Sequence, residues 1–158
     1  MVIKNWLLVI VIVILSLSAI SAISIIPDKK GKGCEVTIII DFDDEYKAEK
    51  ITWKLVFGEW VMLKEESDRA LWIFEKVYVK KPTPYDALLC AKKIGSFSVS
   101  SKYYSNGYFV ESIGGIENGK NGKYWFYYVN KKFGEVSSSN YIVKNNDLIE
   151  WRFEASVW

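Results

Sequence analysis

The chain has 158 residues, of which 50% are hydrophobic and 25% charged, a composition that fits one domain and excludes a disordered protein. It contains no histidine, which excludes Ser-His and Cys-His nucleophilic pairs and histidine metal ligands. Its 21 basic and 19 acidic residues give a net charge of +2, and the four lysines before residue 33 account for that excess. The remainder has no basic excess to offer phosphate backbones and only two arginines, so we expect no nucleic-acid binding.

Residues 1–26 form the first predicted element. The stretch Trp6–Ile26 has no charged residue and is long enough to cross a bilayer as a helix. It also resembles a secretory signal, because Lys4 precedes the apolar run and Ala22 and Ser24 form a small-x-small cleavage pattern. We therefore predict either a cleaved signal peptide or a retained transmembrane anchor. Both give an extracytoplasmic protein, which is either secreted or anchored in the membrane through residues 6–26, and the balanced flanking charges leave the orientation of an anchor open.

A polar linker, residues 27–33, leads into the predicted folded domain, residues 34–158. The segment Cys34–Phe42 alternates with a period of two, which predicts a strand. Alternation continues through Ile51–Lys80, where we predict an antiparallel meander. Part of this meander, at about residues 43–69, adds extra strands to the domain.

The clearest helix start is at Thr83, where Thr83 is the N-cap, Pro84 takes the first helical position and Asp86 favours the positive end of the dipole. Gly95 is predicted to end this helix. Four short strands follow, at Phe97–Tyr104, Tyr108–Ile113, Lys123–Val129 and Leu148–Glu154. One helix among many strands predicts an α+β fold, with a mostly antiparallel sheet packed on one α-helix.

Three motifs of the C-terminal half occur in a recognisable order. They are the capped helix start Thr83–Ala91 (TPYDALLCA), the strand and turn Gly107–Ile116 (GYFVESIGGI) and the strand Tyr124–Lys131 (YWFYYVNK), which the closing Asp147–Phe153 (DLIEWRF) follows. In this order they resemble the transcobalamin-like C-terminal domain family. Its prokaryotic members are secreted or surface domains of unassigned function, related to the C-terminal β domain of transcobalamin and intrinsic factor. The resemblance covers about Cys34–Glu154.

The resemblance implies a β-grasp-like domain, in which a curved sheet packs on a helix. In the vitamin carriers the equivalent domain closes over one face of cobalamin. The helical partner domain of those carriers is not expected in this chain, and residues 43–69 replace what is usually a tight hairpin. The resemblance therefore implies a module for small-ligand or surface recognition. Cobalamin or another corrinoid is one candidate ligand, without cobalamin specificity being implied.

Aromatic side chains mark the candidate binding site. In Lys123–Val129 they point to both faces of the predicted strand, although one aromatic face is enough to fill a core. Tyrosine and tryptophan offer a large contact area and a polar group at low entropic cost, which suits recognition. The alternative is that these rings only cover the core and its rim. The candidate ligand-binding residues are Tyr103, Tyr104, Tyr108, Tyr124, Trp125, Tyr127 and Asn130.

Two other groups of residues have chemistry to consider. Asp41–Glu45 is acidic like the start of a calcium loop, but Tyr46 stands where such a loop needs glycine. We therefore predict a solvated hairpin end and no metal site there. Cys34 and Cys90 can meet in a helix-on-sheet fold, and they are predicted either as the disulfide of an exported protein or as two separate thiols.

The sequence contains no histidine and shows no paired carboxylates across a cleft, so we expect no catalysis. We predict a non-enzymatic binding module, without a cofactor, for a small molecule (corrinoid-like compounds included) or a glycan. The alternative is a cell-envelope structural or adhesion domain whose aromatic surface binds a protein partner.

Overall fold

The strand predicted at Cys34–Phe42 is β1 (Cys34–Asp41), which lies in the middle of a seven-stranded sheet. Its burial alternates as the sequence pattern indicates, with Val36, Ile38 and Ile40 buried. The computed structural model describes residues 33–156, so the predicted signal or anchor at Trp6–Ile26 lies outside the described residues. Within residues 33–156, no helix combines the length and the apolar character that crossing a bilayer requires.

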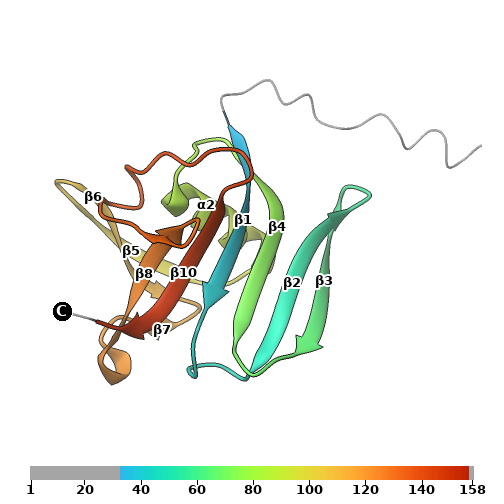
Figure 1. The fold of residues 1–158 in the computed structure, drawn as a ribbon, viewed down its shortest axis with the longest axis horizontal. Helices are drawn as coiled ribbons and strands as arrows, with labels where there is room; N and C mark the ends of the chain where they lie inside the picture. The colour runs from blue at the N-terminus through green and yellow to red at the C-terminus, as the bar shows by residue number, and fades with distance from the viewer. Residues whose placement is uncertain (1–32, 157–158) are drawn as a thin grey trace, which may run out of the picture. The chain divides into compact units, whose positions relative to one another are not determined.

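The large sheet has the strand order β3-β2-β4-β1-β10-β8-β9 (Figure 1). Most neighbouring strands are antiparallel, but β1 and β10 pair in parallel, with Thr37 opposite Leu148. The first and the last strand of the described domain are therefore direct neighbours. In addition to β1, the large sheet contains β2 (Glu49–Val56), β3 (Glu59–Glu66), β4 (Leu71–Val79), β8 (Lys123–Val129), β9 (Lys132–Phe133) and β10 (Leu148–Ala155).

The predicted meander over Ile51–Lys80 is wrong in its strand order. β2 and β3 do form an antiparallel hairpin, but β4 pairs with β2 in parallel and does not follow β3 as its neighbour. Burial explains this arrangement, because β4 contributes Phe74, Val77 and Val79 to the core whereas β3 is almost wholly exposed. Placing β4 between β1 and β2 covers its apolar side chains, and β3 remains at the edge of the sheet.

The predicted helix is α2 (Pro84–Gly95), and its start has the predicted chemistry. The Oγ1 of Thr83 accepts a hydrogen bond of 3.1 Å from the backbone N–H of Asp86, and Pro84 opens the first turn. At the other end the left-handed residue is Ser96, with φ of 53°, and not the predicted Gly95, which is the last helical residue. The helix buries Ala87, Leu88 and Ala91 and packs on β4 and β1.

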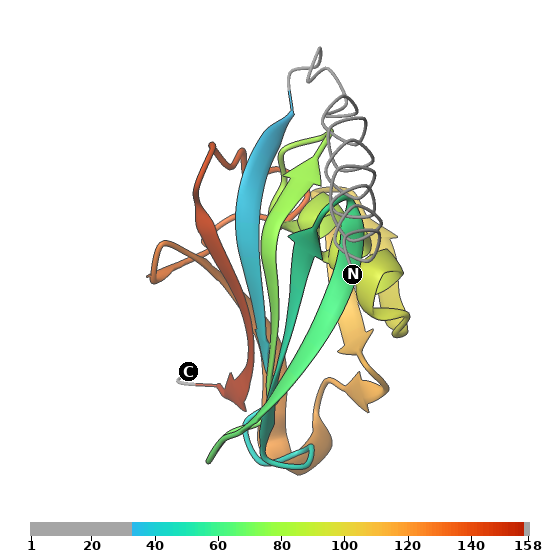
Figure 2. The same ribbon diagram turned by 90° about the vertical axis from the view of Figure 1, so that its right-hand side faces the viewer.

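A second sheet of three strands contains β5 (Val99–Tyr104), β6 (Gly107–Ile113) and β7 (Ile116–Glu117). A single 3-10 turn, η1 (Lys120–Gly122), then leads into β8. Figure 2 shows α2 and this second sheet on the same side of the large sheet. The described residues thus form a sheet-dominated α+β fold with one α-helix, as predicted, but with two sheets. The sequence did not predict β7, η1 or β9, which have only two or three residues each.

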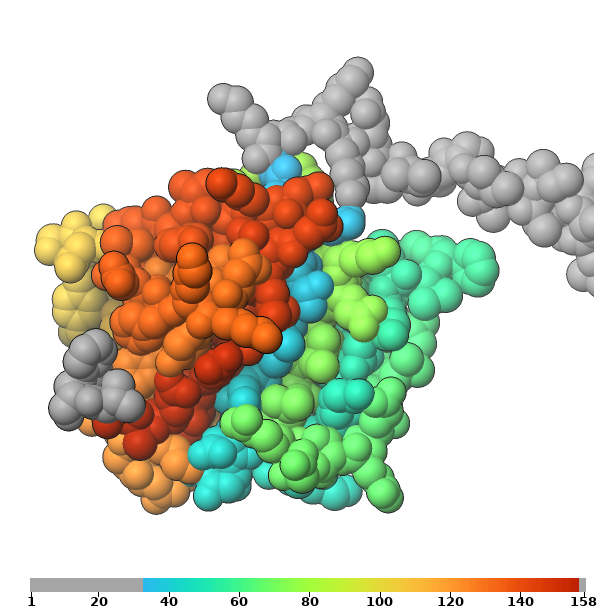
Figure 3. All heavy atoms as spheres, in the orientation of Figure 1, coloured from blue at the N-terminus to red at the C-terminus, as the bar shows by residue number. Residues whose placement is uncertain are grey.

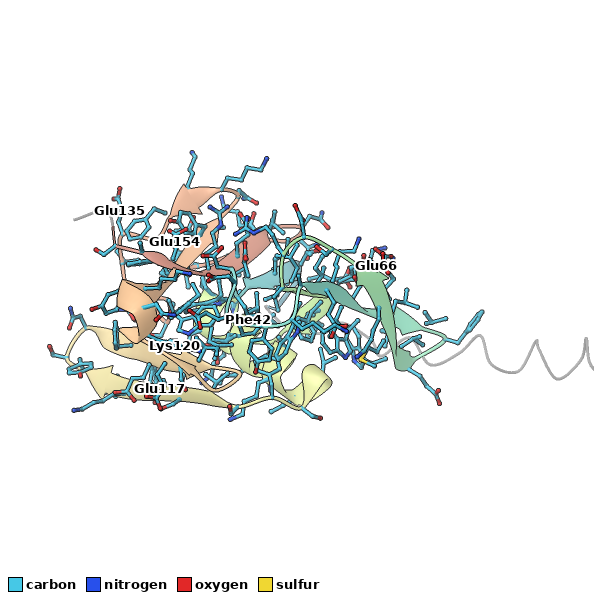
Figure 4. All side chains as sticks on the ribbon, turned by 90° about the horizontal axis from the view of Figure 1, so that it is seen from below. Phe42, Glu66, Glu117, Lys120, Glu135 and Glu154 are labelled. Carbon is cyan, nitrogen blue, oxygen red and sulfur yellow. The ribbon has the colours of Figure 1, made fainter. Side chains whose placement is uncertain are left out.

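Aromatic rings fill much of the core. Phe42, labelled in Figure 4, has its ring centroid 4.5 Å from those of Tyr46 and Trp72 and 5.4 Å from that of Trp125. Trp125 in turn contacts Phe153 of β10 at 5.1 Å. These ring contacts connect the middle of the large sheet to β8, and they include Trp125, one of the candidate ligand-binding residues.

The turn of the β2–β3 hairpin contains only Phe57 and Gly58, because Val56 pairs with Glu59. Both turn residues have positive φ, 50° for Phe57 and 87° for Gly58, as in a type I′ turn. Asparagine, aspartate and glycine are preferred in the first position, whereas a left-handed conformation costs a bulky residue roughly 1–3 kcal/mol. Phe57 is also fully exposed to solvent, so its ring gives the described fold no packing energy in return.

Candidate ligand site

The alternation predicted for Lys123–Val129 is confirmed. However, Trp125 and Tyr127, which were expected to bind a ligand, lie on the inward face of β8. The side chains of Trp125 and Tyr127 are only 5% and 7% exposed. Trp125 Nε1 donates a hydrogen bond of 2.8 Å to the Ile116 carbonyl, and the Tyr127 hydroxyl donates one of 2.6 Å to the Val136 carbonyl. Burial raises the pKa of Tyr127 to about 12, so this hydroxyl remains a donor. Both residues belong to the core and are not part of an exposed platform.

The outward face of β8 is occupied by neighbouring side chains of the same domain. The Arg152 guanidinium lies 4.3 Å from the Tyr128 ring centroid, and the Tyr128 hydroxyl donates to Glu154. Burial, followed by this hydrogen bond, raises the pKa of Tyr128 to about 12. Tyr124 is 40% exposed, but it lies where β8 begins, opposite Glu154 of β10. It does not join the other candidate tyrosines.

Asn130 has a structural role in the turn after β8, where its φ is 51°. Its Nδ2 donates a hydrogen bond of 2.8 Å to Asp147 Oδ1, and its Oδ1 accepts one of 2.9 Å from the Leu148 backbone N–H. Both polar atoms of the amide therefore hold β8 to the start of β10. Asn130 thus has a structural role, and its part in ligand binding stays a prediction.

Tyr103, Tyr104 and Tyr108 are exposed, as the binding hypothesis requires, and they lie together on the β5–β6 hairpin. Tyr103 and Tyr108 face each other across the two strands, with their ring centroids 5.2 Å apart in an edge arrangement. The Tyr85 ring of α2 stacks on Tyr108 at 4.5 Å and 5°. The Tyr85 hydroxyl also makes a hydrogen bond of 2.7 Å with Ser101 Oγ. Three tyrosine rings thus meet between α2 and the hairpin.

These rings line an open hollow of about 500 Å³ between the start of α2 and the hairpin, which we call the tyrosine hollow. A second hollow, of about 390 Å³, lies beside it, and Tyr108 lines both. Aromatic faces and hydrogen-bonding groups therefore occur side by side, as in sites for small ligands. The tyrosine hollow is lined by Tyr85, Tyr103, Tyr108, Leu89, Lys81, Thr83, Asp86, Ser105, Asn106, Gly107, Ser139 and Asn140, and the second hollow by Tyr104, Asn106, Gly107, Tyr108, Phe109 and Ser137.

A serine-rich loop, residues 136–140, holds the hairpin in place. Ser137 Oγ donates a hydrogen bond of 3.1 Å to the Tyr108 carbonyl, and Ser139 Oγ accepts one of 3.1 Å from the Tyr108 N–H. Asn140 Nδ2 donates to the Asn106 carbonyl at 2.9 Å. Gly107 permits this close approach, because a Cβ at this position would lie 2.4 Å from Ser137 Oγ and its φ is 120°. The loop therefore fixes the backbone of Tyr108.

The sequence analysis did not identify Tyr85, Asp86, the serine-rich loop or Asn140 as parts of the site. The run Ser137-Ser138-Ser139-Asn140 is an available signal, because consecutive short polar side chains without alternation are typical of loops that hydrogen-bond backbone groups. The hydrogen-bond partner of this loop, the Tyr108 backbone, lies about 30 residues away in the chain. No pattern in the sequence predicts that contact.

The acidic cluster after β1 is satisfied by basic side chains and offers no free carboxylate pair. Arg69 lies 2.7 Å from Asp41, and Lys123 contacts both Asp43, at 2.8 Å, and Asp44. The hydrogen bond from Lys123 lowers the pKa of Asp44, and the pair of carboxylates raises the pKa of Lys123. Among the described residues, no group of three or more acidic or cysteine side chains is placed to hold a metal ion.

The two cysteines are free thiols, so the disulfide alternative for Cys34 and Cys90 is not present in the structure. The Sγ of Cys34 is directed to the Val143 carbonyl at 3.8 Å, in the segment before β10. Cys90 is partly buried on α2. Burial raises the pKa of both thiols, as expected for cysteines that act as small apolar residues.

Comparison with a solved structure, that of haptocorrin, supports this fold. Residues 94–155 match a family model described as a domain of unknown function, DUF4430. The structure resembles haptocorrin in complex with Cbi, with a TM-score of 0.53 and 14% identity over 80% of this chain and 26% of that chain. A protein of Ruminococcus gnavus ATCC 29149 proposed to bind metal gives a TM-score of 0.45 with 10% identity, over 78% of this chain and 98% of that chain. Among curated proteins, none matches the sequence.

The described domain therefore has a transcobalamin-like fold, and it corresponds to about a quarter of the haptocorrin chain. At 14% identity the likeness concerns the fold and not the ligand. The DUF4430 match begins near the end of α2 and includes the β5–β6 hairpin and the serine-rich loop, but it leaves out the β2–β3 hairpin.

Proposed function

We propose that this chain is a non-enzymatic, extracytoplasmic binding module that holds a small molecule or a glycan in the tyrosine hollow. Corrinoid-like compounds are among the candidate ligands. In this proposal residues 1–26 are the signal or anchor, and residues 34–158 are a β-grasp-like domain of the transcobalamin-like C-terminal domain family. The observation that carries the proposal is the meeting of Tyr85, Tyr103 and Tyr108 in one open hollow.

The chemistry of the hollow supports a flat or ring-shaped ligand. Tyr103 is 65% exposed and presents its ring to solvent, while Tyr108 is held between Tyr85 and Tyr103. A ring that stacks there gains aromatic contacts worth about 0.5–1.5 kcal/mol beyond the area buried. Asp86, Ser139 and Asn140 supply hydrogen-bonding groups at the rim.

The rigidity of the site also supports binding. Ser137 and Ser139 fix the Tyr108 backbone, and Tyr85 fixes its ring. A site ordered before the ligand arrives spends less of the binding energy on ordering side chains. The resemblance in fold to haptocorrin, whose structure is a complex with Cbi, further supports a small ligand.

The alternative function, a cell-envelope structural domain that binds a protein partner through the same tyrosines, fits this surface less well. Protein interfaces have a broad, well-packed core, whereas the tyrosines line two hollows of about 500 and 390 Å³. Catalysis is not proposed, because the nearby acids have structural partners: Asp86 accepts a hydrogen bond of 2.6 Å from Thr83.

The test is a ligand titration of the full chain with cobalamins, incomplete corrinoids and soluble oligosaccharides, followed by tyrosine fluorescence and thermal unfolding. We expect at least one class to bind and raise the unfolding temperature. Tyr103→Ala should weaken that binding by about tenfold or more, the equivalent of ~1.4 kcal/mol. Tyr124→Ala is the matched control, because this exposed tyrosine lies outside the hollow. Absence of binding by all three classes, or equal loss in both variants, would contradict the proposal.

A further inference from the structure

The β2–β3 hairpin carries an exposed apolar surface that the proposed ligand site does not use. β3 is the edge of the large sheet, and nearly all of its residues are exposed. Figure 1 shows the hairpin at the side of the sheet away from β8, and Figure 3 shows it protruding from that side. Large exposed apolar surfaces mark interaction sites, and this hairpin exposes apolar side chains on both of its faces. Its exposed members are Leu55, Val56, Phe57, Val61, Met62 and Leu63, with Trp60 partly exposed among them.

The turn of this hairpin has a residue that the fold itself does not favour. Phe57 takes a left-handed φ of 50°, and its ring is fully exposed. Asparagine would satisfy the turn better and expose no apolar ring. A large ring kept where both the backbone and the solvent oppose it is explained by a contact outside the described domain.

The topology places Phe57 at the end of the sheet where the chain enters the domain. β2 runs parallel to β4 and therefore antiparallel to β1, so the turn after β2 lies at the end where β1 begins. One strand separates β2 from β1, which puts the two about 10 Å apart at the usual strand spacing. The linker, residues 27–33, spans at most about 25 Å when extended. The chain therefore enters the described domain at the same end of the sheet as this turn.

Lysines outnumber acidic side chains at this end of the domain. Glu35, Glu59, Asp86 and Asp147 also lie here, and Glu75 is paired with Lys54 at 3.3 Å. The acidic cluster Asp41–Glu45 follows the other end of β1. Basic residues near a membrane favour its anionic lipids. The exposed lysines that follow β4, follow β8 or precede β10 at this end are Lys80, Lys81, Lys131, Lys132 and Lys144, with Lys76 near the end of β4.

We propose that the β2–β3 turn docks on an anionic lipid bilayer, with the Phe57 ring in the headgroup region and Leu55, Val56 and Trp60 beside it. Aromatic side chains favour this zone, where a ring can leave water while the backbone remains hydrated. The proposal rests on the predicted entry of Trp6–Ile26 into the membrane and does not depend on the ligand. Docking would orient the domain by two attachments, the linker and the turn.

A second copy of the chain fits this surface less well than a bilayer. In the register centred on Met62, two antiparallel β3 edges would place Glu59 of one copy opposite Glu65 of the other, and this repulsion disfavours that register. A bilayer, in contrast, can accept apolar side chains from both faces of a hairpin. This argument makes self-association the competing outcome of the experiment.

The experiment places the full chain in nanodiscs of phosphatidylcholine and phosphatidylglycerol that contain a lipid with a nitroxide on its headgroup. Paramagnetic broadening of backbone amide signals then reports which residues lie near the headgroups. We expect the Gly58 signal to lose most of its intensity, and the Gly122 signal, next to β8 at the opposite end of the sheet, to keep it. Phe57→Asn should restore much of the Gly58 signal, whereas Tyr124→Asn, an exposed aromatic at the far end, should not.

Each other outcome overturns the proposal. A chain that enters the discs but shows no broadening at Gly58 contradicts docking and leaves the anchor standing. A chain that does not enter the discs removes the anchor and docking together. Shifts of the β3 amide signals between discs that hold one chain and discs that hold two would assign the surface to a second copy. None of these results affects the ligand titration, so the two proposals fail separately.

Discussion

The two hairpins of this domain both expose aromatic rings beside a short turn, but they are supported in opposite ways. The β5–β6 hairpin is held on one side by α2 and on the other by the serine-rich loop, residues 136–140. Within residues 33–156, the β2–β3 hairpin has β4 as its one neighbouring strand, and β3 is an edge strand. Fixed rings suit a ligand of defined shape, whereas unsupported rings suit a partner that deforms around them. Exposure alone therefore does not define the kind of recognition.

The largest expected effect tests whether Trp125 belongs to the buried core, unlike the exposed rings of the β5–β6 hairpin. Trp125→Ala removes a buried indole and its hydrogen bond to Ile116, so we expect a loss of about 3–5 kcal/mol in the free energy of unfolding. Urea unfolding followed by circular dichroism measures it. A loss near that of an exposed residue such as Tyr124 would show that the ring belongs to the surface after all.

The glycines at the two turns sharpen the comparison. Gly107→Ala brings a Cβ against the oxygens of Ser137 and Ser139, in addition to the strain of a φ of 120°, and should lower the free energy of unfolding by about 2–3 kcal/mol. At Gly58, no atom lies within 4 Å of an added Cβ, so Gly58→Ala should cost only the strain, about 1 kcal/mol. Equal losses of unfolding free energy in the two variants, measured by chemical denaturation, would mean that the serine-rich loop does not hold the β5–β6 hairpin.

A substitution at Phe57, in the turn of the β2–β3 hairpin, should stabilise the fold instead of destabilising it. Phe57→Asn replaces a strained, fully exposed ring with a residue that a type I′ turn prefers, so the free energy of unfolding should rise by about 0.5–1 kcal/mol. Thermal unfolding of the chain in detergent, without a bilayer, measures this gain. A lower melting temperature would show that Phe57 contributes to folding, and the explanation by an outside contact would lose its basis.

The smallest effect concerns the acidic cluster, which is remote from both hairpin turns. Because Lys123 lowers the pKa of Asp44 from 3.8, their pairing stabilises the folded state above that pH and is lost as the pH falls through the lowered pKa. Lys123→Met should therefore be slightly less stable than the unmodified chain at about pH 7, and the difference should shrink at about pH 3. Urea unfolding at the two pH values tests this. A difference independent of pH would point to lost packing.

Much of the fold could be predicted because its signals are local. The period of two gave the positions of β1, β8 and β10, and the capping pattern at Thr83 and Pro84 gave the start of α2. The same period does not state which strand lies beside which, and so the parallel pairing of β2 with β4 was missed. Strand neighbours depend on how much apolar surface each strand has to bury, summed over the whole domain.

The candidate site was predicted only in part for a related reason. Alternation separates Tyr124 from Trp125, but it does not say which of two aromatic faces is inside. Tyr103, Tyr104 and Tyr108 could be identified because they lie next to a turn, where neither face can be deeply covered. Tyr85 and Ser139 join them through contacts between distant segments, which depend on the completed fold.

The parallel pairing of β1 with β10 has a consequence for how the chain is made. β1 holds β4 on one side and β10 on the other, so the two halves of the large sheet are separate until β10 has been synthesised. Closing contacts between such distant segments is slow, because the loop entropy must be overcome first. A ribosome would therefore synthesise nearly the whole domain before its large sheet could close.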